Sequence, residues 1–365
     1  MNTGLVYVPI VKGKLNDIKA AAFVSNEIAP AMKPVFELPP FIESDGPEQI
    51  LARFATRLSK LYSKRPCYVD FPMLKSGATT STGEPILQVA YGQLNALNLN
   101  FQPVYGFDRD DINWPLVLSQ SKASGGMLLR LDLDDLEFMD DTFDRIQDLT
   151  LRGLDTRQMD VMVDLRSLSV NSSLIAAEST AQFLDNLSTS FNVRNTIVAG
   201  SSAPKTVAEI PKNSNLGIYR NELNVWANLR ARNLPVEVTF GDYGVIHPDF
   251  TDLTPSPHIN GKIRYTKGKH IHIFRGHSLR LDDKYEQYRK LAHSVMNSGH
   301  YEGHKFSTGD RFIYDCASGQ ASTGSPGTWV FNDQNHHFTY SISQMIRLEK
   351  LVYRGYSGDA IMELA

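Results

Sequence analysis

The first 250 residues alternate between short apolar runs and longer amphipathic stretches. The run at 5–11 is rich in β-branched residues and ends at a Lys-Gly pair, which is typical of a short buried strand. The stretch at 47–62 has apolar residues three and four positions apart, which predicts an amphipathic helix. The same alternation predicts eight strands, at 5–11, 33–38, 67–71, 101–105, 126–132, 160–166, 193–199 and 236–240. It predicts helices between them at 18–29, 47–62, 85–97, 114–122, 142–151, 173–188 and 219–233.

Eight strands separated by helices in this length of chain match a (β/α)8 barrel of the TIM type. Such alternation implies parallel strands joined by right-handed crossovers. The alternative is an open, doubly wound sheet, but the sequence has neither a G-x-G-x-x-G motif after the first strand nor a P-loop. We therefore predict an α/β fold with a barrel domain at 1–250.

The pattern changes after residue 250, where a histidine-rich segment begins. Two short apolar runs at 262–265 and 270–274 flank a Lys-Gly-Lys turn, which predicts a β-hairpin. The remaining predicted elements are a helix at 281–297, a strand at 311–314, a Gly/Ser/Thr loop at 318–327 and a helix at 338–352. We predict that residues 251–365 form a C-terminal α+β elaboration packed on the barrel.

Composition and charge exclude several classes of protein. The chain is 42% hydrophobic and 21% charged, as in ordinary globular proteins, and its net charge of −3 gives no overall field that attracts nucleic acid. Two cysteines, Cys67 and Cys316, argue against a disulfide framework and favour a reducing cytoplasm. We find no signal peptide and no apolar run of the roughly 20 residues that cross a bilayer. We therefore expect a cytoplasmic protein with no membrane partner.

Polar side chains follow nearly every predicted strand. In a barrel the loops after the strands form the functional face, so these side chains are expected to meet at one opening. They are Lys12, Glu37, Asp70, Tyr105 with Asp108, Arg130 with Asp132, Asp164 with Arg166, Ser201 with Ser202, and Asp242 with Tyr243. Such groups either neutralise one another in a structural ion-pair network or bind a phosphate or sugar through the cations.

Glu37 and Asp164 are the strongest candidates for acid–base chemistry because each lies within an apolar stretch. Burial raises the pKa of a carboxyl group unless a cation pairs with it, and Lys12 or Arg166 is the natural partner. The candidate catalytic residues are thus Glu37, Asp164, Lys12 and Asp70. The candidate ligand-binding residues of the barrel are Tyr105, Arg130, Asp132, Arg166, Asp242 and Tyr243.

A divalent metal is a further alternative for the same opening. Magnesium or manganese prefers hard oxygen ligands, which are offered by Glu37, Asp70, Asp132 and Asp164. No spacing identifies such a site, since the sequence has no H-E-x-x-H motif and no EF-hand loop. The sequence therefore identifies no cofactor.

The predicted hairpin carries a second group of candidate ligand-binding residues. His270 and His272 are two positions apart, so both rings face one side of a strand, and Arg275 and His277 follow. Such a pair binds zinc only with further ligands. A phosphate backbone could instead contact a basic hairpin with Tyr265 and Phe274 interleaved, whose cations are Lys262, Arg264, Lys267, Lys269, Arg275 and Arg280. The alternative is an ordinary solvated charged face.

Six short segments resemble a known family in their order along the chain. They are 8–12 (VPIVK), 34–39 (PVFELP), 68–70 (YVD), 241–243 (GDY), 263–266 (IRYT) and 274–276 (FRG). In these segments the chain resembles the "beta family" proteins of phages and bacterial genomes, which often lie near mobile or defence genes. The resemblance implies a phage or antiviral-defence context but no activity. It marks as motif positions Lys12, Glu37, Asp70, Asp242, Arg264 and Arg275.

Two functions are compatible with these features. The first is hydrolytic or phosphoryl chemistry on a phosphate-bearing small molecule or nucleic acid, with Glu37 or Asp164 as acid or base. The anion would contact Lys12, Arg130, Arg166 and Arg275. The second is non-catalytic binding of a protein or nucleic acid through the extension, by Arg275, His272 and His277. A homo-oligomer is compatible with either.

Overall fold

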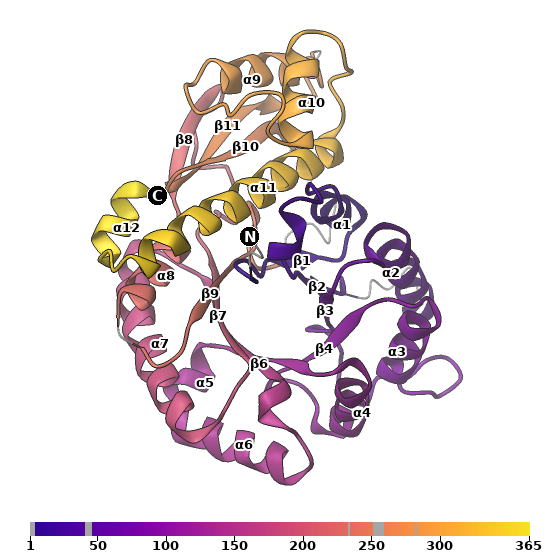
Figure 1. Cartoon of the computed structure of the whole chain (residues 1–365). Coiled ribbons are helices and arrows are strands. Elements are labelled where there is room, and N and C mark those ends of the chain that lie inside the picture. Colours follow the sequence, from indigo (N-terminus) through magenta and orange to yellow (C-terminus); the bar gives the residue numbers. More distant parts are fainter. Residues whose placement is uncertain (1–3, 41–45, 233, 251–258, 282) are drawn as a thin grey trace.

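The computed structural model describes residues 4–40, 46–232, 234–250, 259–281 and 283–365. A ring of strands surrounded by helices forms the larger part of the molecule, and a smaller sheet with its own helices lies on one side of it (Figure 1). The long helix α11 (Pro326–Tyr353) crosses between the two parts.

Eight strands form one parallel sheet whose strand order follows the chain. They are β1 (Ile10–Lys12), β2 (Val35–Glu37), β3 (Cys67–Asp70), β4 (Phe101–Tyr105), β5 (Met127–Leu131), β6 (Met159–Ser167), β7 (Asn195–Ser201) and β9 (Val238–Asp242). Tyr7, just before β1, forms bridges with both Met32 and Phe240, so the first and last strands meet. The sheet is therefore a nearly closed barrel, as the alternating pattern predicted, and its strand order has no reversal of the doubly wound kind.

Helices on the outside of the barrel cover the apolar faces of the strands. Helix α2 shows why they form: Leu51, Phe54 and Leu58 lie three and four positions apart and are all buried. The barrel helices are α1 (Leu15–Ala22), α2 (Pro47–Tyr62), α3 (Ile86–Ala96), α4 (Trp114–Ser124), α5 (Leu133–Glu137), α6 (Met139–Leu151), α7 (Val170–Ser190) and α8 (Asn221–Ala231). Short 3-10 helices occur at η1 (Ala29–Ala31), η2 (Asp111–Asn113) and η3 (Thr156–Gln158).

The inside of the barrel is a packed apolar core with polar layers at its two ends. Apolar side chains from alternate strand positions fill the middle, among them Ile10, Val35 and Leu128. At the amino ends of the strands, buried Asp160 accepts hydrogen bonds from Tyr68 and Arg194. The layer at the carboxyl ends contains the candidate site.

The extension is built on a three-stranded antiparallel sheet of order β10–β11–β8. Strands β10 (Asn260–Lys267) and β11 (His270–Ser278) form the predicted hairpin. Strand β8 (Ser214–Tyr219) comes from the loop region after β7, so a segment that precedes residue 250 completes this sheet. The helices of the extension are α9 (Gln287–Met296), α10 (Thr308–Ala317), α11 and α12 (Gly358–Leu364).

Two predictions for the extension were wrong. Residues 311–314 lie in α10 rather than in a strand, because Ser307 caps a helix there by accepting from the Asp310 amide. The last helix starts at Pro326, which follows a capping box at Ser325, and not at 338. His336, which precedes the predicted start of this helix at 338, is therefore a fully buried residue within it.

Candidate functional site

Strand register brings three ionisable residues into one row at the carboxyl end of the barrel. Lys12 pairs with Glu37, and Glu37 pairs with Asp70, as the last residues of β1, β2 and β3. Each lies two positions beyond a side chain of the inner core, so each points inward as well. Arg130 on β5 and Asp164 on β6 follow core residues in the same way. The strand-end pattern in the sequence thus identified residues that converge.

Arg130 is the centre of this network. Its Nη1 lies 2.8 Å from Glu37 Oε1 and 2.6 Å from Asp70 Oδ2. On the other side of the guanidinium, Nη2 lies 2.7 Å from Asp164 Oδ2 and donates to the hydroxyl of Tyr243 at 2.8 Å. Tyr243 in turn donates to Asp164 Oδ2 at 2.6 Å. The buried guanidinium of β5 therefore joins groups from three other strands and from the segment after β9.

Lys12 completes the network beside Glu37. Its Nζ lies 2.5 Å from Glu37 Oε2, donates to the carbonyl of Pro248 and sits 4.1 Å from the ring centre of Phe250. Burial lowers the pKa of Lys12, and the adjacent Glu37 carboxylate opposes that shift. Lys12 is thus a buried amine under the segment that follows β9.

The network is balanced in charge. Arg109, in the loop after β4, lies 3.1 Å from Asp70 Oδ1. Burial alone would raise the pKa of Asp70, but Arg109 and Arg130 lower it below its ordinary value. Three cations, Lys12, Arg109 and Arg130, face three buried carboxylates, Glu37, Asp70 and Asp164. Arg109 also pairs with the exposed carboxylate of Asp108. The first role of the network is therefore structural, because its buried charges neutralise one another. This is one of the two alternatives that the sequence left open.

Above the buried network lies a partly exposed rim with surplus positive charge. Arg166 and Lys205 each lie 3.0 Å from one carboxylate, that of Asp249, and the three side chains are 43%, 65% and 42% exposed. Arg166 has a φ of 54°, a left-handed conformation that is strained in a residue with a side chain. Its amide donates to Asp164 Oδ1 at 3.0 Å, which holds this backbone in place.

His247 belongs to the same rim. Its Nδ1 accepts a hydrogen bond from the Asp249 amide at 3.1 Å, so in the neutral ring the proton is on Nε2. Burial lowers the pKa of His247, and of the charged neighbours Asp249 raises it while Lys205, Arg166 and Lys12 lower it. A neutral imidazole N–H is therefore available as a donor at neutral pH.

Three predicted barrel residues lie away from the opening. Tyr105 points outward and packs against Trp114, with ring centres 5.2 Å apart, because its neighbour Val104 is the inward residue of β4. Asp132 caps α5 by accepting from two amides of its first turn. Asp242 also points outward, since Tyr243 beside it points in.

Asp242 instead joins the barrel to the extension. The imidazole of His337 on α11 contacts both parts. Its Nε2 lies 2.8 Å from Asp242 Oδ2 of the barrel, and its Nδ1 lies 2.6 Å from Thr266 Oγ1 on β10. Hydroxyl, imidazole and carboxylate stand here in the order of a nucleophilic triad. All three residues have no exposed surface, so we assign this cluster to holding the extension on the barrel rather than to catalysis.

The predicted residues of the extension do not reach the barrel opening. Arg264 lies 3.7 Å from Asp333 of α11, and Arg275 donates to backbone carbonyls of Ala208 and Ile210. His277 lies 2.7 Å from Asp283, and His272 stacks on His300. The aromatic residues that were to interleave with the basic side chains, Tyr265 and Phe274, are buried in the core of the extension. They therefore provide no stacking surface for bases.

The four carboxylates proposed as metal ligands do not form a metal site. Glu37, Asp70 and Asp164 all contact Arg130, so a guanidinium takes the central position, and Asp132 caps a helix. No group of three or more His, Cys, Asp or Glu residues with the arrangement of a metal site occurs in the described part of the chain.

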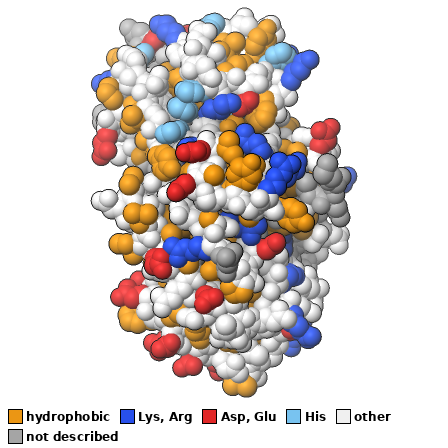
Figure 2. All heavy atoms as spheres, turned by 60° about the vertical axis from the view of Figure 1, so that its left-hand side comes forward, with side chains coloured by type: hydrophobic (Ala, Val, Ile, Leu, Met, Phe, Trp, Pro, Cys, Tyr) orange, Lys and Arg blue, Asp and Glu red, His pale blue; other side chains and the backbone are white. Residues whose placement is uncertain are grey.

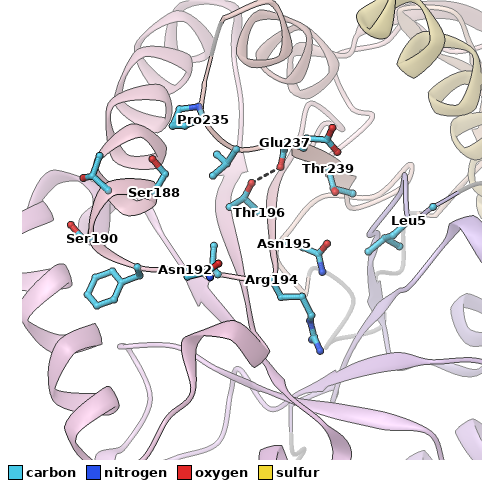
Figure 3. A pocket seen from close by; sticks show the side chains of 15 residues that line it. Leu5, Ser188, Ser190, Asn192, Arg194, Asn195, Thr196, Pro235, Glu237 and Thr239 are labelled. Carbon is cyan, nitrogen blue, oxygen red and sulfur yellow. Dashed lines mark hydrogen bonds between the residues drawn. The ribbon is translucent and has the colours of Figure 1, made fainter.

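A polar hollow of about 790 Å³ lies at the opposite end of the barrel. Its walls come from the loop before β7 and the segment before β9, with Arg194, Asn195 and Glu237 around it (Figure 3). Thr196 donates to the carbonyl of Glu237 at 2.6 Å across its wall. Arg194 is already bound to Asp160, so its charge is satisfied within the barrel.

Sequence reasoning missed Arg109, Lys205, His247 and Asp249. Arg109 could have been found, because it follows Asp108 directly in the loop after β4. Asp249 lies in the segment after the last strand, but nothing in the sequence indicates that it bridges two cations. That relationship depends on how the segment folds back over the opening.

Comparison with known proteins adds one identification. No curated protein matches the chain. None of the helices in the described segments has both the length and the apolar character needed to cross a membrane. A family model described as Beta protein matches residues 7–343, which include the whole barrel and most of the extension. The chain therefore belongs to the Beta protein family, as the short segments from VPIVK to FRG indicated.

Proposed function

We propose that the barrel is of the (β/α)8 type and that its carboxyl-end opening binds a phosphate-bearing ligand, a small molecule or the end of a nucleic acid, and hydrolyses it. One observation supports this proposal most directly. Arg166 and Lys205 share the single carboxylate of Asp249 above the buried network, whose buried charges balance. Two partly exposed cations on one anion are the arrangement that a phosphate group also satisfies.

In this proposal Asp249 occupies the position of the ligand's anion. A phosphate would displace it from Arg166 and Lys205 and would take a further hydrogen bond from His247. The strained backbone of Arg166 supports a role for its side chain, since such strain is retained where surrounding contacts impose it. Moving Asp249 would also lift the neighbouring Phe250 from Lys12.

The proposed chemistry uses the network below. A water oxygen bonds to phosphorus, the bond to the leaving oxygen breaks, Lys12 gives that oxygen a proton, and Glu37 takes one from the water. The lowered pKa of Lys12 supports its part as a donor, and its contact of 2.5 Å with Glu37 lets the proton return. Asp164 and Arg130 orient Glu37 through the guanidinium.

Isothermal titration with inorganic pyrophosphate tests the anion site. We expect Asp249→Asn to tighten binding, because it removes the internal competitor, and Arg166→Gly to weaken it by about tenfold or more. Glycine suits the φ of 54° at this position, so the fold is retained. The control is Arg157→Gly, which removes an exposed arginine paired with Asp155 near the opposite end of β6. Equal binding by all four proteins would overturn the proposal.

Hydrolysis is tested separately with bis(p-nitrophenyl) phosphate. Glu37→Gln and Asp164→Asn should abolish p-nitrophenol release while pyrophosphate still binds and circular dichroism is unchanged. Binding without any turnover by the wild-type protein would refute the hydrolytic part and leave an anion-binding barrel. We also propose a cytoplasmic location and a phage or defence context, the first supported by the two buried free thiols Cys67 and Cys316.

A further inference from the structure

Strand β8 is an uncovered edge of the extension's sheet. β11 pairs with one side of it, and no strand in the described part of the chain pairs with the other. Its sequence, SNLGIY, has no charged residue and no proline, the usual means of protecting an edge. Asn215, Leu216 and Gly217 are exposed, and Figure 1 shows β8 on the outer side of the smaller sheet.

The hydrogen-bond pattern defines which backbone groups face the open side. The Arg220 amide donates to the Lys269 carbonyl at 2.8 Å, which sets the alternation of the antiparallel ladder. Leu216 and Ile218 therefore point their backbone groups toward β11, whereas Asn215 and Gly217 point theirs outward. Among the described residues, no backbone or side-chain group bonds to these outward groups of Asn215 and Gly217.

Imidazole side chains lie on the face of the sheet next to this edge. Gly217 lies opposite His272 in the register and has no side chain above the sheet. His272 stacks on His300 with ring centres 3.7 Å apart, and His270 lies 5.8 Å from His272. Histidines gather in the upper part of the molecule in Figure 2, which brings the left side of Figure 1 forward. The rings of His270 and His272 therefore lie against this face of the sheet at Gly217, and a strand added beside the edge would have these polar rings next to it.

A pocket of about 290 Å³ opens at the other end of β8, against α9. Asn215 and Phe274 form its floor, and Lys290 and Leu291 of α9 form its wall. None of the described residues lining it is a carboxylate, and the nearby Asp283, which also interacts with Lys290 through its charge, is paired with His277 at 2.7 Å. A side chain that enters this pocket meets the ammonium group of Lys290, so charge complementarity favours an acidic one.

We propose that β8 binds an extended acidic peptide of a partner protein, which adds a fourth strand to the sheet. The peptide backbone pairs with the outward groups of Asn215 and Gly217, and one of its carboxylates enters the pocket beside Lys290. A second copy of β8 fits less well, because SNLGIY has no acidic residue to offer Lys290. This interaction surface is independent of the barrel opening.

The test uses the full chain and two fluorescein-labelled peptides, (Thr-Glu)4 and (Thr-Lys)4, with fluorescence anisotropy as readout. We expect the wild-type protein to bind the Glu peptide and not the Lys peptide. Gly217→Pro should weaken binding by about tenfold or more, because it removes an outward N–H without removing a ladder bond to β11. Gly217→Ala is the matched control: its β-carbon would lie 3.4 Å from His272 Nδ1, an ordinary contact, and it keeps the N–H.

Lys290→Glu tests the charge. It should weaken binding of the Glu peptide and permit binding of the Lys peptide. Thermal melting of each variant checks that the fold is intact. The proposal is overturned if the Glu peptide does not bind, if Gly217→Pro binds it as the Gly217→Ala control does, or if light scattering shows a dimer that Gly217→Pro dissociates, since the edge would then pair with a second copy.

Discussion

The phenol of Tyr7 donates a 2.5 Å hydrogen bond to Asp242 Oδ1, although 235 positions separate the two residues. Tyr7 precedes the first barrel strand and Asp242 ends the last one, so the bond crosses the line where the sheet closes. Both side chains are fully buried. Because His337 of α11 contacts the other oxygen of Asp242, barrel closure and attachment of the extension depend on one carboxylate.

Replacing Tyr7 by Phe removes this bond while preserving the ring. We expect a loss of about 1–3 kcal/mol in the free energy of unfolding, because a buried carboxylate oxygen then keeps only the Gly244 amide as a donor. The matched control is Tyr91→Phe, since the Tyr91 hydroxyl is buried and has no hydrogen-bond partner among the described residues. Urea denaturation of both variants measures the difference, and equal losses would contradict the role of Tyr7.

Replacing Arg130 by Met should be far more damaging. Glu37, Asp70 and Asp164 would all lose a buried donor, and breaking buried ion pairs costs about 3–5 kcal/mol. The comparison is Arg157→Met, which removes an exposed arginine paired with Asp155 and should leave the urea midpoint unchanged. A mild effect of Arg130→Met would mean that water, rather than Arg130, satisfies these carboxylates.

Lys12 and Glu37 should be energetically coupled. Lys12→Met leaves Glu37 Oε2 without its cation, and Glu37→Gln leaves the ammonium without an anionic partner, beside the Pro248 carbonyl and aromatic faces. The double variant should therefore be more stable than the sum of the two single losses predicts, by about 1 kcal/mol or more. A double-mutant cycle in urea measures this, and strict additivity would show that the pair does not act as a unit.

Asp333 gives the protein a defined pH dependence. Burial raises its pKa to about 7, opposed by Arg264, whereas an unfolded aspartate titrates near its ordinary value of about 3.9. The folded state thus binds the proton more tightly. The contribution that protonated Asp333 makes to the free energy of unfolding is complete below pH about 3.9 and is lost as the pH rises through about 7.

Asp333→Asn removes that titration. Its stability relative to the wild type should rise between pH 4 and pH 8, because the asparagine cannot ionise and its oxygen can still accept from the Arg264 amide. Melting temperatures of both proteins across this range provide the measurement. A constant difference between them at every pH would contradict the raised pKa of Asp333.

Local pattern in the sequence was sufficient for the barrel strands and for the convergence of Lys12, Glu37 and Asp70 at its opening. Parallel strands that are buried on both faces read as short apolar runs, and a polar residue that ends such a run must lie at the same edge as its neighbours. The sequence did not predict β8 because no residue of SNLGIY is buried, so the strand lacks the run of buried apolar residues that marks the barrel strands.

Tertiary structure decided which of these residues act together. Asp242 and Tyr243 are adjacent in sequence, but one points to α11 and the other to Arg130, because neighbouring strand residues face opposite sides and the register sets which is which. The network around Arg130, the position of Asp249 between two cations and the burial of His337 against the barrel depend on contacts between residues 34 to 113 positions apart. The sequence determined the elements and the end of the barrel where charge collects; only packing in three dimensions paired the charges, because pairing depends on distance rather than on order along the chain.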